Sequence, residues 1–202
     1  MSRITLATLS LTLAASVALA AAPQTPKAPA APAPPSAPVA PTAPAPPAAP
    51  TPLPVVVKNV DAIHALVLPM KGSYAQHGEA FGRLFGQAGS QGATPLGPPF
   101  GRYFNSMGTV AEADLLWEIG FPVGPDVKSS APFEIKDIAA GLTATLVYQG
   151  PSGSVGDVGY RFAQWVDANG YRSTGAMMMV FSGPMDPQTM SAELRIPVEK
   201  AK

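Results

Sequence analysis

The sequence contains no cysteine among its 202 residues, which excludes disulfide bonds, a thiol nucleophile and a lipid-modified mature amino terminus. Charged residues make up only 13% of the chain, with thirteen basic side chains against thirteen acidic ones. The chain therefore lacks the excess of basic residues that is typical of proteins that bind nucleic acid or an anionic membrane surface. A ligand must therefore be recognised locally, and we expect no nucleic-acid partner.

Short catalytic and cofactor-binding motifs are also missing. The sequence has no G-x-S-x-G elbow, no Walker loop and no H-E-x-x-H pair. The glycines of residues 153–159 lack the G-x-G-x-x-G spacing of a dinucleotide site. The two histidines, His64 and His77, are not spaced as metal ligands. We therefore expect no cofactor and no metal site.

Proline, by contrast, is abundant: the chain has 25, and more than half of them lie ahead of the folded part. Residues 1–20 combine Arg3, an apolar stretch and small residues near the end, which is the layout of a cleavable secretory signal peptide. Residues 21–54 hold 14 prolines and 12 alanines, which predicts a disordered, semi-rigid linker. We expect a periplasmic or secreted protein without stable membrane insertion after cleavage; an uncleaved amino-terminal anchor is the alternative.

The remaining residues, 55–202, contain one unit twice. Gly72 matches Gly150 at an offset of 78 (150 − 72), and Glu118 matches Glu193 at an offset of 75 (193 − 118). The copies span about 55–124 and about 131–199. Each copy has the pattern strand, helix, strand, strand. The segments that show it are 64–70, 81–88, 100–105 and 115–121 in the first copy, and 142–148, 155–166, 177–181 and 192–196 in the second.

This pattern predicts an α+β fold in which two strand-helix-strand-strand units are related by pseudo-twofold symmetry, with an antiparallel sheet and both helices on one face. A ligand cleft is expected at the axis between the halves. Glycines at 78, 82 and 86 each cost the first helix about 1 kcal/mol relative to alanine. Tight packing of that helix face against the sheet or the twin helix is expected to offset the loss.

The segment Leu116 to Val123, LWEIGFPV, places a carboxylate in an apolar strand. Side chains alternate between the two faces of a strand, so Trp117 and Phe121 share the core side while Glu118 faces away, with Gly120 leaving room beside it. Glu118 therefore lies either on a solvated sheet face or at the floor of a cleft, where it attracts a cationic guest. In the second copy, Arg195 shares the face of Glu193 and neutralises it.

Several motifs occur in the same order as in a known family. They are GSYAQHGEAFG, GPPFGRYF, WEIGFPV and ELRIPV. The chain resembles the GyrI-like small-molecule-binding domain, which is the effector-binding domain of AraC-type and multidrug-responsive bacterial regulators. The resemblance implies a ligand cleft between the halves, with an acidic residue on the strand that ends in Pro-Val, here Glu118 and Glu193. The family's Gly-Pro-Tyr motif carries over onto Tyr74, whereas the second copy has Ser152 in that place. In regulators a DNA-binding module stands where this chain has its signal peptide and linker.

Aromatic and methionine side chains on the central strands supply the walls of the expected site. Our candidate ligand-binding residues are Tyr74, Tyr103, Glu118, Met177, Met179, Phe181 and Glu193. The primary hypothesis is non-catalytic binding or sequestration of small hydrophobic or cationic molecules. The alternatives are a hydrolase in which a cleft glutamate and a tyrosine activate water, a haem binder with His64 as the axial ligand, and a structural envelope protein.

Overall fold

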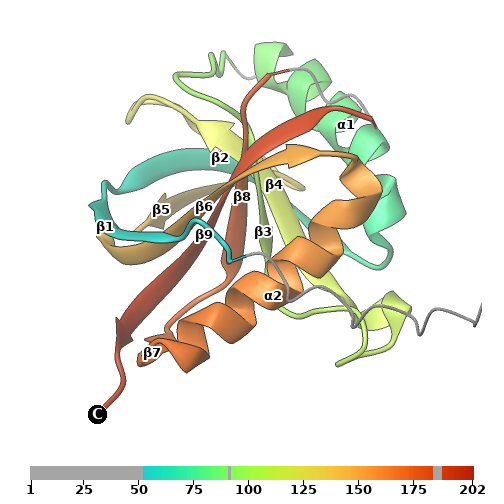
Figure 1. Cartoon of the computed structure of the whole chain (residues 1–202). Coiled ribbons are helices and arrows are strands. Elements are labelled where there is room, and N and C mark those ends of the chain that lie inside the picture. The colour runs from blue at the N-terminus through green and yellow to red at the C-terminus, as the bar shows by residue number, and fades with distance from the viewer. Residues whose placement is uncertain (1–51, 91, 184–187) are drawn as a thin grey trace, which may run out of the picture. The chain divides into compact units, whose positions relative to one another are not determined.

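The computed structural model describes residues 52–90, 92–183 and 188–202 (Figure 1). The predicted signal peptide and nearly all of the predicted linker lie outside the described residues. The described chain forms an antiparallel sheet with two helices, α1 (His77–Ser90) and α2 (Val155–Ala168), on one side of it. The predicted α+β class is therefore confirmed. Within the described residues, neither helix is long and apolar enough to cross a membrane.

In the part of the chain that the structure describes, nine strands make up the sheet, and their order is nearly palindromic. The order is β1-β6-β9-β8-β3-β4-β2-β5, with β7 paired to β9. Strands β1, β2, β3 and β4 of the first copy correspond to β5, β6, β8 and β9 of the second. Exchanging each strand for its counterpart gives the same order, read from the other end of the sheet. The strands are β1 (Val56–Val60), β2 (Ile63–Lys71), β3 (Phe100–Tyr103), β4 (Leu116–Pro122), β5 (Glu134–Ile138), β6 (Gly141–Gly150), β7 (Tyr171–Ser173), β8 (Met177–Phe181) and β9 (Met190–Lys200).

The element bounds follow the offset found in the sequence. Helix α2 starts 78 residues after α1 (155 − 77), and β5 starts 78 residues after β1 (134 − 56). The sequence did not predict β1 or β5, because both are short and carry polar residues. Strand β1 pairs with β6 and β5 pairs with β2. The first strand of each copy thus completes the half of the sheet that the other copy builds, which is consistent with the predicted duplication.

The two faces of the sheet carry different cores. On the helix side, α1 packs over β2 and β4, and α2 packs over β6, β7 and β9. The central pair of strands, β3 and β8, lies between these two regions. We call the helix-side face of this pair the seam; its side chains are Tyr103, Met177, Met179 and Phe181. The opposite face holds a smaller apolar cluster of Ala65, Val67, Phe100, Met178 and Val180.

The glycine-bearing face of α1 does not pack as we expected. A Cβ atom added at Gly78, Gly82 or Gly86 would meet no atom within 4 Å, and all three residues are exposed. Tight packing therefore does not compensate for the low helix propensity of these glycines, because the buried face of α1 is the one carrying Phe81 and Leu84.

Substituting Gly82 by alanine is expected to raise the free energy of unfolding by about 1 kcal/mol, because alanine gains helix propensity where its methyl group has open space. Urea denaturation followed by circular dichroism measures this change. Gly170→Ala is the matched control of opposite sign, because Gly170 ends α2 with a φ of +76° that disfavours alanine. A loss of stability in Gly82→Ala would show that this helix face makes a close contact.

Candidate functional site

Four aromatic side chains meet at one end of the seam, where α1 begins. We call Tyr74, His77, Tyr103 and Trp117 the aromatic cluster. The His77 ring stacks on Trp117 with centroids 4.3 Å apart, and Tyr74 meets Tyr103 edge to face at 5.2 Å. Trp117 is buried, while the other three are half-buried. Part of the cluster is therefore open to a ligand from solvent.

Hydrogen bonds hold the cluster in a defined arrangement. Nδ1 of His77 contacts the carbonyl oxygen of Tyr74, and Nε2 of His77 lies 2.9 Å from the hydroxyl of Tyr103. Because a carbonyl only accepts, Nδ1 carries the proton of the neutral ring and Nε2 accepts from Tyr103. The Tyr74 hydroxyl donates to the Asn105 carbonyl at 2.7 Å. The Trp117 indole N–H donates to the Gly72 carbonyl at 3.0 Å.

The cluster is electrically neutral near pH 7. Burial lowers the pKa of His77, and the hydrogen bond with the Tyr74 backbone only partly opposes that effect. Burial raises the pKa of Tyr74. The pKa of Tyr103 is raised strongly, first by burial and then by the neighbouring Tyr74. The imidazole is therefore unprotonated and both phenols keep their protons.

The remaining seam residues differ in how accessible they are. Met177 is half-buried beneath α2, since a Cβ atom on Gly159 would come within 3.4 Å of its sulfur. Met179 and Phe181 are buried, and Phe181 packs edge to face on Phe81 of α1 with centroids 5.5 Å apart. Of the predicted wall residues, Tyr103 and Met177 lie in the half-buried part of the seam, and Tyr74 lies beside them in the aromatic cluster. Met179 and Phe181 lie in the core.

Glu118 lies on the opposite face of the sheet and is fully paired. It is 1% exposed, with Oε1 accepting from Nη1 of Arg102 and Oε2 from Nζ of Lys136, both at 2.7 Å. Nζ of Lys136 also lies 3.2 Å from Oε2 of Glu134. Burial disfavours the charge of Lys136, but its contacts with Glu118 and Glu134 outweigh this and raise its pKa. The first ion cluster, Arg102, Glu118 and Lys136, therefore leaves no unpaired carboxylate for a cationic guest.

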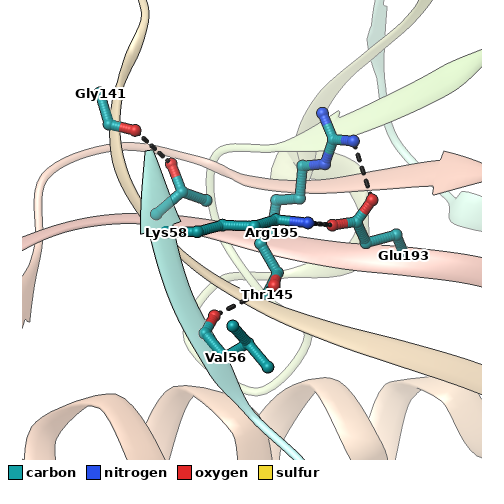
Figure 2. A network of polar contacts seen from close by, with 7 residues as sticks. Val56, Lys58, Gly141, Thr145, Glu193 and Arg195 are labelled. Carbon is teal, nitrogen blue, oxygen red and sulfur yellow. Dashed lines mark hydrogen bonds and ion pairs between the residues drawn. The ribbon is translucent and has the colours of Figure 1, made fainter. Parts of the chain in front are cut away.

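Glu193 has a corresponding environment in the second copy (Figure 2). The second ion cluster consists of Lys58, Glu193 and Arg195, with Lys58 2.9 Å and Arg195 2.8 Å from the carboxylate. Burial disfavours the charge of Glu193, but Arg195 and Lys58 outweigh it and lower the pKa. Lys58 and Lys136 are 78 residues apart (136 − 58), so each copy supplies the lysine of the other copy's cluster.

The sheet separates the predicted acids from the predicted phenols. Glu118 and Glu193 point away from the helices, whereas Tyr74 and Tyr103 belong to the helix-side core. The hydrolase hypothesis required a glutamate and a tyrosine to converge on one water molecule, and the structure does not bring them together. The space beside Glu118 that we assigned to Gly120 is also occupied, because Phe100 packs against that glycine.

The haem hypothesis assigned His64 as an axial ligand. Its Nδ1 lies 2.6 Å from Oδ1 of Asp137 on the neighbouring strand β5. His64 therefore already has a carboxylate partner on one ring nitrogen. Across the described ranges, no group of three or more His, Asp or Glu side chains is placed to hold a metal ion.

Sequence reasoning missed several residues of these sites. It treated His77 as an ordinary histidine and Trp117 as core only, and it did not consider Arg102, Lys58 or Lys136. The two lysines were detectable, because they recur at the 78-residue offset of the repeat. The meeting of His77 with Tyr103 had no sequence signal, because 26 residues separate them.

Two shallow hollows lie away from the seam. One, of about 400 Å³, lies between α1 and the segment before β5, and is lined by Gly82, Arg83, Gly86, Gln87, Pro132 and Phe133. The other, of about 390 Å³, is lined by residues at the end of β6 and the start of β9. Neither contains a residue of the aromatic cluster or of the seam.

Small-molecule sites are usually lined by apolar and aromatic side chains with a few convergent polar groups, and the aromatic cluster has this composition. The chain belongs to the GyrI-like family, because the model of the GyrI-like small molecule binding domain matches residues 53–199. This confirms the resemblance stated from the motifs and supports binding of a small-molecule ligand.

Solved structures show the same fold at low sequence identity. The EcmrR C-terminal domain superposes with a TM-score of 0.66 and 18% identity, over 74% of this chain and 99% of that domain. The EcmrR chain in an EcmrR–DNA complex gives 0.62 and 19%, over 73% of this chain and 57% of that one. An uncharacterized conserved protein from Listeria innocua gives 0.55 and 14%, over 72% and 92%. No curated protein matches the chain.

Proposed function

We propose that the chain binds and sequesters a small hydrophobic or cationic aromatic molecule at the seam, without catalysis. The observation that carries this proposal is the convergence of Tyr74, His77, Tyr103 and Trp117 beside Met177, between the regions that α1 and α2 cover. Aromatic rings offer flat faces to apolar groups and to cations. The flexible thioether of Met177 can move to admit ligands of different shape.

The absence of catalysis is supported by the placement of the acids. The two glutamates that could act as bases lie across the sheet from the phenols, and each already forms ion pairs with two cations. The neutral His77 is engaged through both ring nitrogens. Within the described residues of the seam, no unpaired general base is therefore presented to a ligand.

Tyr103→Ala is expected to weaken ligand binding at least about tenfold, because it removes one wall of the seam and the hydrogen-bond partner of His77. The assay is fluorescence titration with 10-methylacridinium, a permanent aromatic cation, and with its uncharged isostere 9-methylanthracene. Val147→Ala is the matched control, because Val147 is 65% exposed on the face away from the helices. Failure of both probes to bind the unaltered protein at pH 8, or equal losses in the two variants, would contradict the proposed site.

We also propose that the protein works in the periplasm or outside the cell. This rests on the composition of residues 1–20 and on the Ala/Pro-rich segment that follows. Mass spectrometry of the protein purified from the producing cells tests it, with a mature amino terminus after Ala20 or Ala22 as the expected result. An intact Met1 in the cytoplasmic fraction would contradict it.

A further inference from the structure

Among the described residues at the seam, His77 is the ionisable group whose charge can change within the ordinary range of pH. Tyr74 from the short helix Tyr74–Gln76, Tyr103 from β3 and Trp117 from β4 all pack against its ring. The titratable groups among them are the two phenols, and burial holds both in the neutral form. Among the described residues, no salt bridge or hydrogen bond joins His77 to a carboxylate.

The carboxylates of the two ion clusters cannot balance a charge on His77, and Glu79, the acidic residue in the first turn of α1, is exposed to solvent. Glu118 and Glu193 lie on the far face of the sheet, where Arg102, Lys136, Lys58 and Arg195 already neutralise them. A proton on Nε2 would also replace the acceptor that now receives the Tyr103 hydroxyl. Protonation would therefore add a positive charge to the wall of the seam, at a ring whose two hydrogen-bond partners are a backbone carbonyl and a phenol.

We propose that His77 sets the charge preference of the seam: neutral His77 admits both uncharged and cationic aromatic ligands, and protonated His77 repels the cationic ones. The inference rests on the proposed function, because it concerns the same site. A cation seated against the Tyr103 ring would lie close to the imidazole, because the two ring centroids are 5.7 Å apart. Like charges at such a separation repel enough to weaken binding roughly tenfold or more. An uncharged ligand of the same shape does not experience this repulsion.

The direction of the pH dependence follows from the state of His77. Burial keeps the pKa of His77 below its ordinary value of 6.5, so the ring stays neutral at pH 7 and above. The affinity for a cation is therefore full at neutral pH and falls as the pH drops through the pKa of His77. By linkage, a saturating cation lowers the pKa of His77 further, because bound cation and proton disfavour each other.

The test titrates the full chain with 10-methylacridinium and 9-methylanthracene between pH 8 and pH 4.5, with circular dichroism confirming that the protein stays folded. The acridinium affinity is expected to fall roughly tenfold or more in acid, and the anthracene affinity to change much less. His77→Gln should abolish the difference between the probes, because glutamine is neutral at every pH in this range. His64→Gln is the matched control and should leave the difference intact, since His64 contacts Asp137 and lies outside the aromatic cluster.

A direct measurement keeps the proposal testable if His77→Gln does not fold. The chain has two histidines, so NMR of the imidazole protons in His64→Gln reports His77 alone. Saturating acridinium should shift the His77 midpoint to lower pH, and anthracene should not. Equal pH dependence of the two probes, or an unmoved His77 midpoint, overturns the proposal while leaving the proposed function standing. No binding of either probe at pH 8 overturns the proposed function itself.

Discussion

Replacing Glu118 by glutamine is expected to lower the free energy of unfolding by about 3 kcal/mol, with little change in ligand affinity. The carboxylate is 1% exposed and accepts from two cations, Arg102 and Lys136. A glutamine side chain has one carbonyl to accept with, and its NH₂ group would face the second cation as another donor. The side chains of Arg102 and Lys136 are 21% and 35% exposed, so water still solvates part of each cation. The expected loss of stability is therefore at the lower end of the range seen when one partner of a buried ion pair is removed.

Ligand affinity should persist because Glu118 and the aromatic cluster lie on opposite faces of the sheet. Urea denaturation measures the stability change, and acridinium titration of the folded variant measures the affinity. Glu193→Gln is the matched control and should lower the free energy of unfolding by less than Glu118→Gln does. The side chain of Glu193 is 23% exposed, so solvent can replace part of the lost interaction. A large loss of acridinium affinity in a fully folded Glu118→Gln variant would show that the carboxylate contributes to the ligand site.

Gly120→Ala is expected to destabilise the protein by about 2–4 kcal/mol. A Cβ atom at this position would lie 2.6 Å from the Leu66 carbonyl oxygen, 2.8 Å from Cγ1 of Val67 and 3.0 Å from Cζ of Phe100. The closest contact is with backbone in the middle of the β2–β4 pair, which cannot move without breaking the sheet. Since small domains are stable by only about 5–15 kcal/mol, this loss is a large fraction of the total.

Gly124→Ala provides the control for Gly120→Ala. A Cβ atom on Gly124 would meet no atom within 4 Å, so the substitution is expected to change stability by less than about 0.5 kcal/mol. Thermal and urea denaturation of the two variants give the comparison. If both variants were equally stable, the close packing of Phe100 on Gly120 would not hold in solution.

Local periodicity made most of the fold predictable. The alternation in residues 115–123 correctly separated Trp117 from Glu118, because neighbouring side chains of a strand point to opposite faces whatever the strand pairs with. The helical period in residues 155–166 likewise located α2, which spans Val155–Ala168. By contrast, β1 and β5 were missed, since their strand character comes from pairing with β6 and β2 rather than from their own polar sequences.

The candidate site was only partly predictable. Tyr74, Tyr103 and Met177 were identified and do lie in or beside the half-buried part of the seam. The same reasoning placed Glu118 and Glu193 with them, because a sequence shows which residues share a face of one strand but not what covers that face. The cations that neutralise Glu118 come from β3 and β5, 16 and 18 residues away.

The sequence by itself determined the α+β class, the family, and the division of each strand into a core side and a polar side, and it predicted a repeated unit with which the strand order is consistent. All of these rest on patterns within a few residues or on copies at a fixed offset. Only the tertiary structure decided that Glu118 in LWEIGFPV is buried and paired, and that His77 meets Tyr103 and Trp117. Those outcomes depend on contacts between distant strands, whose side-chain distances are set by sheet pairing and helix docking and not by local sequence.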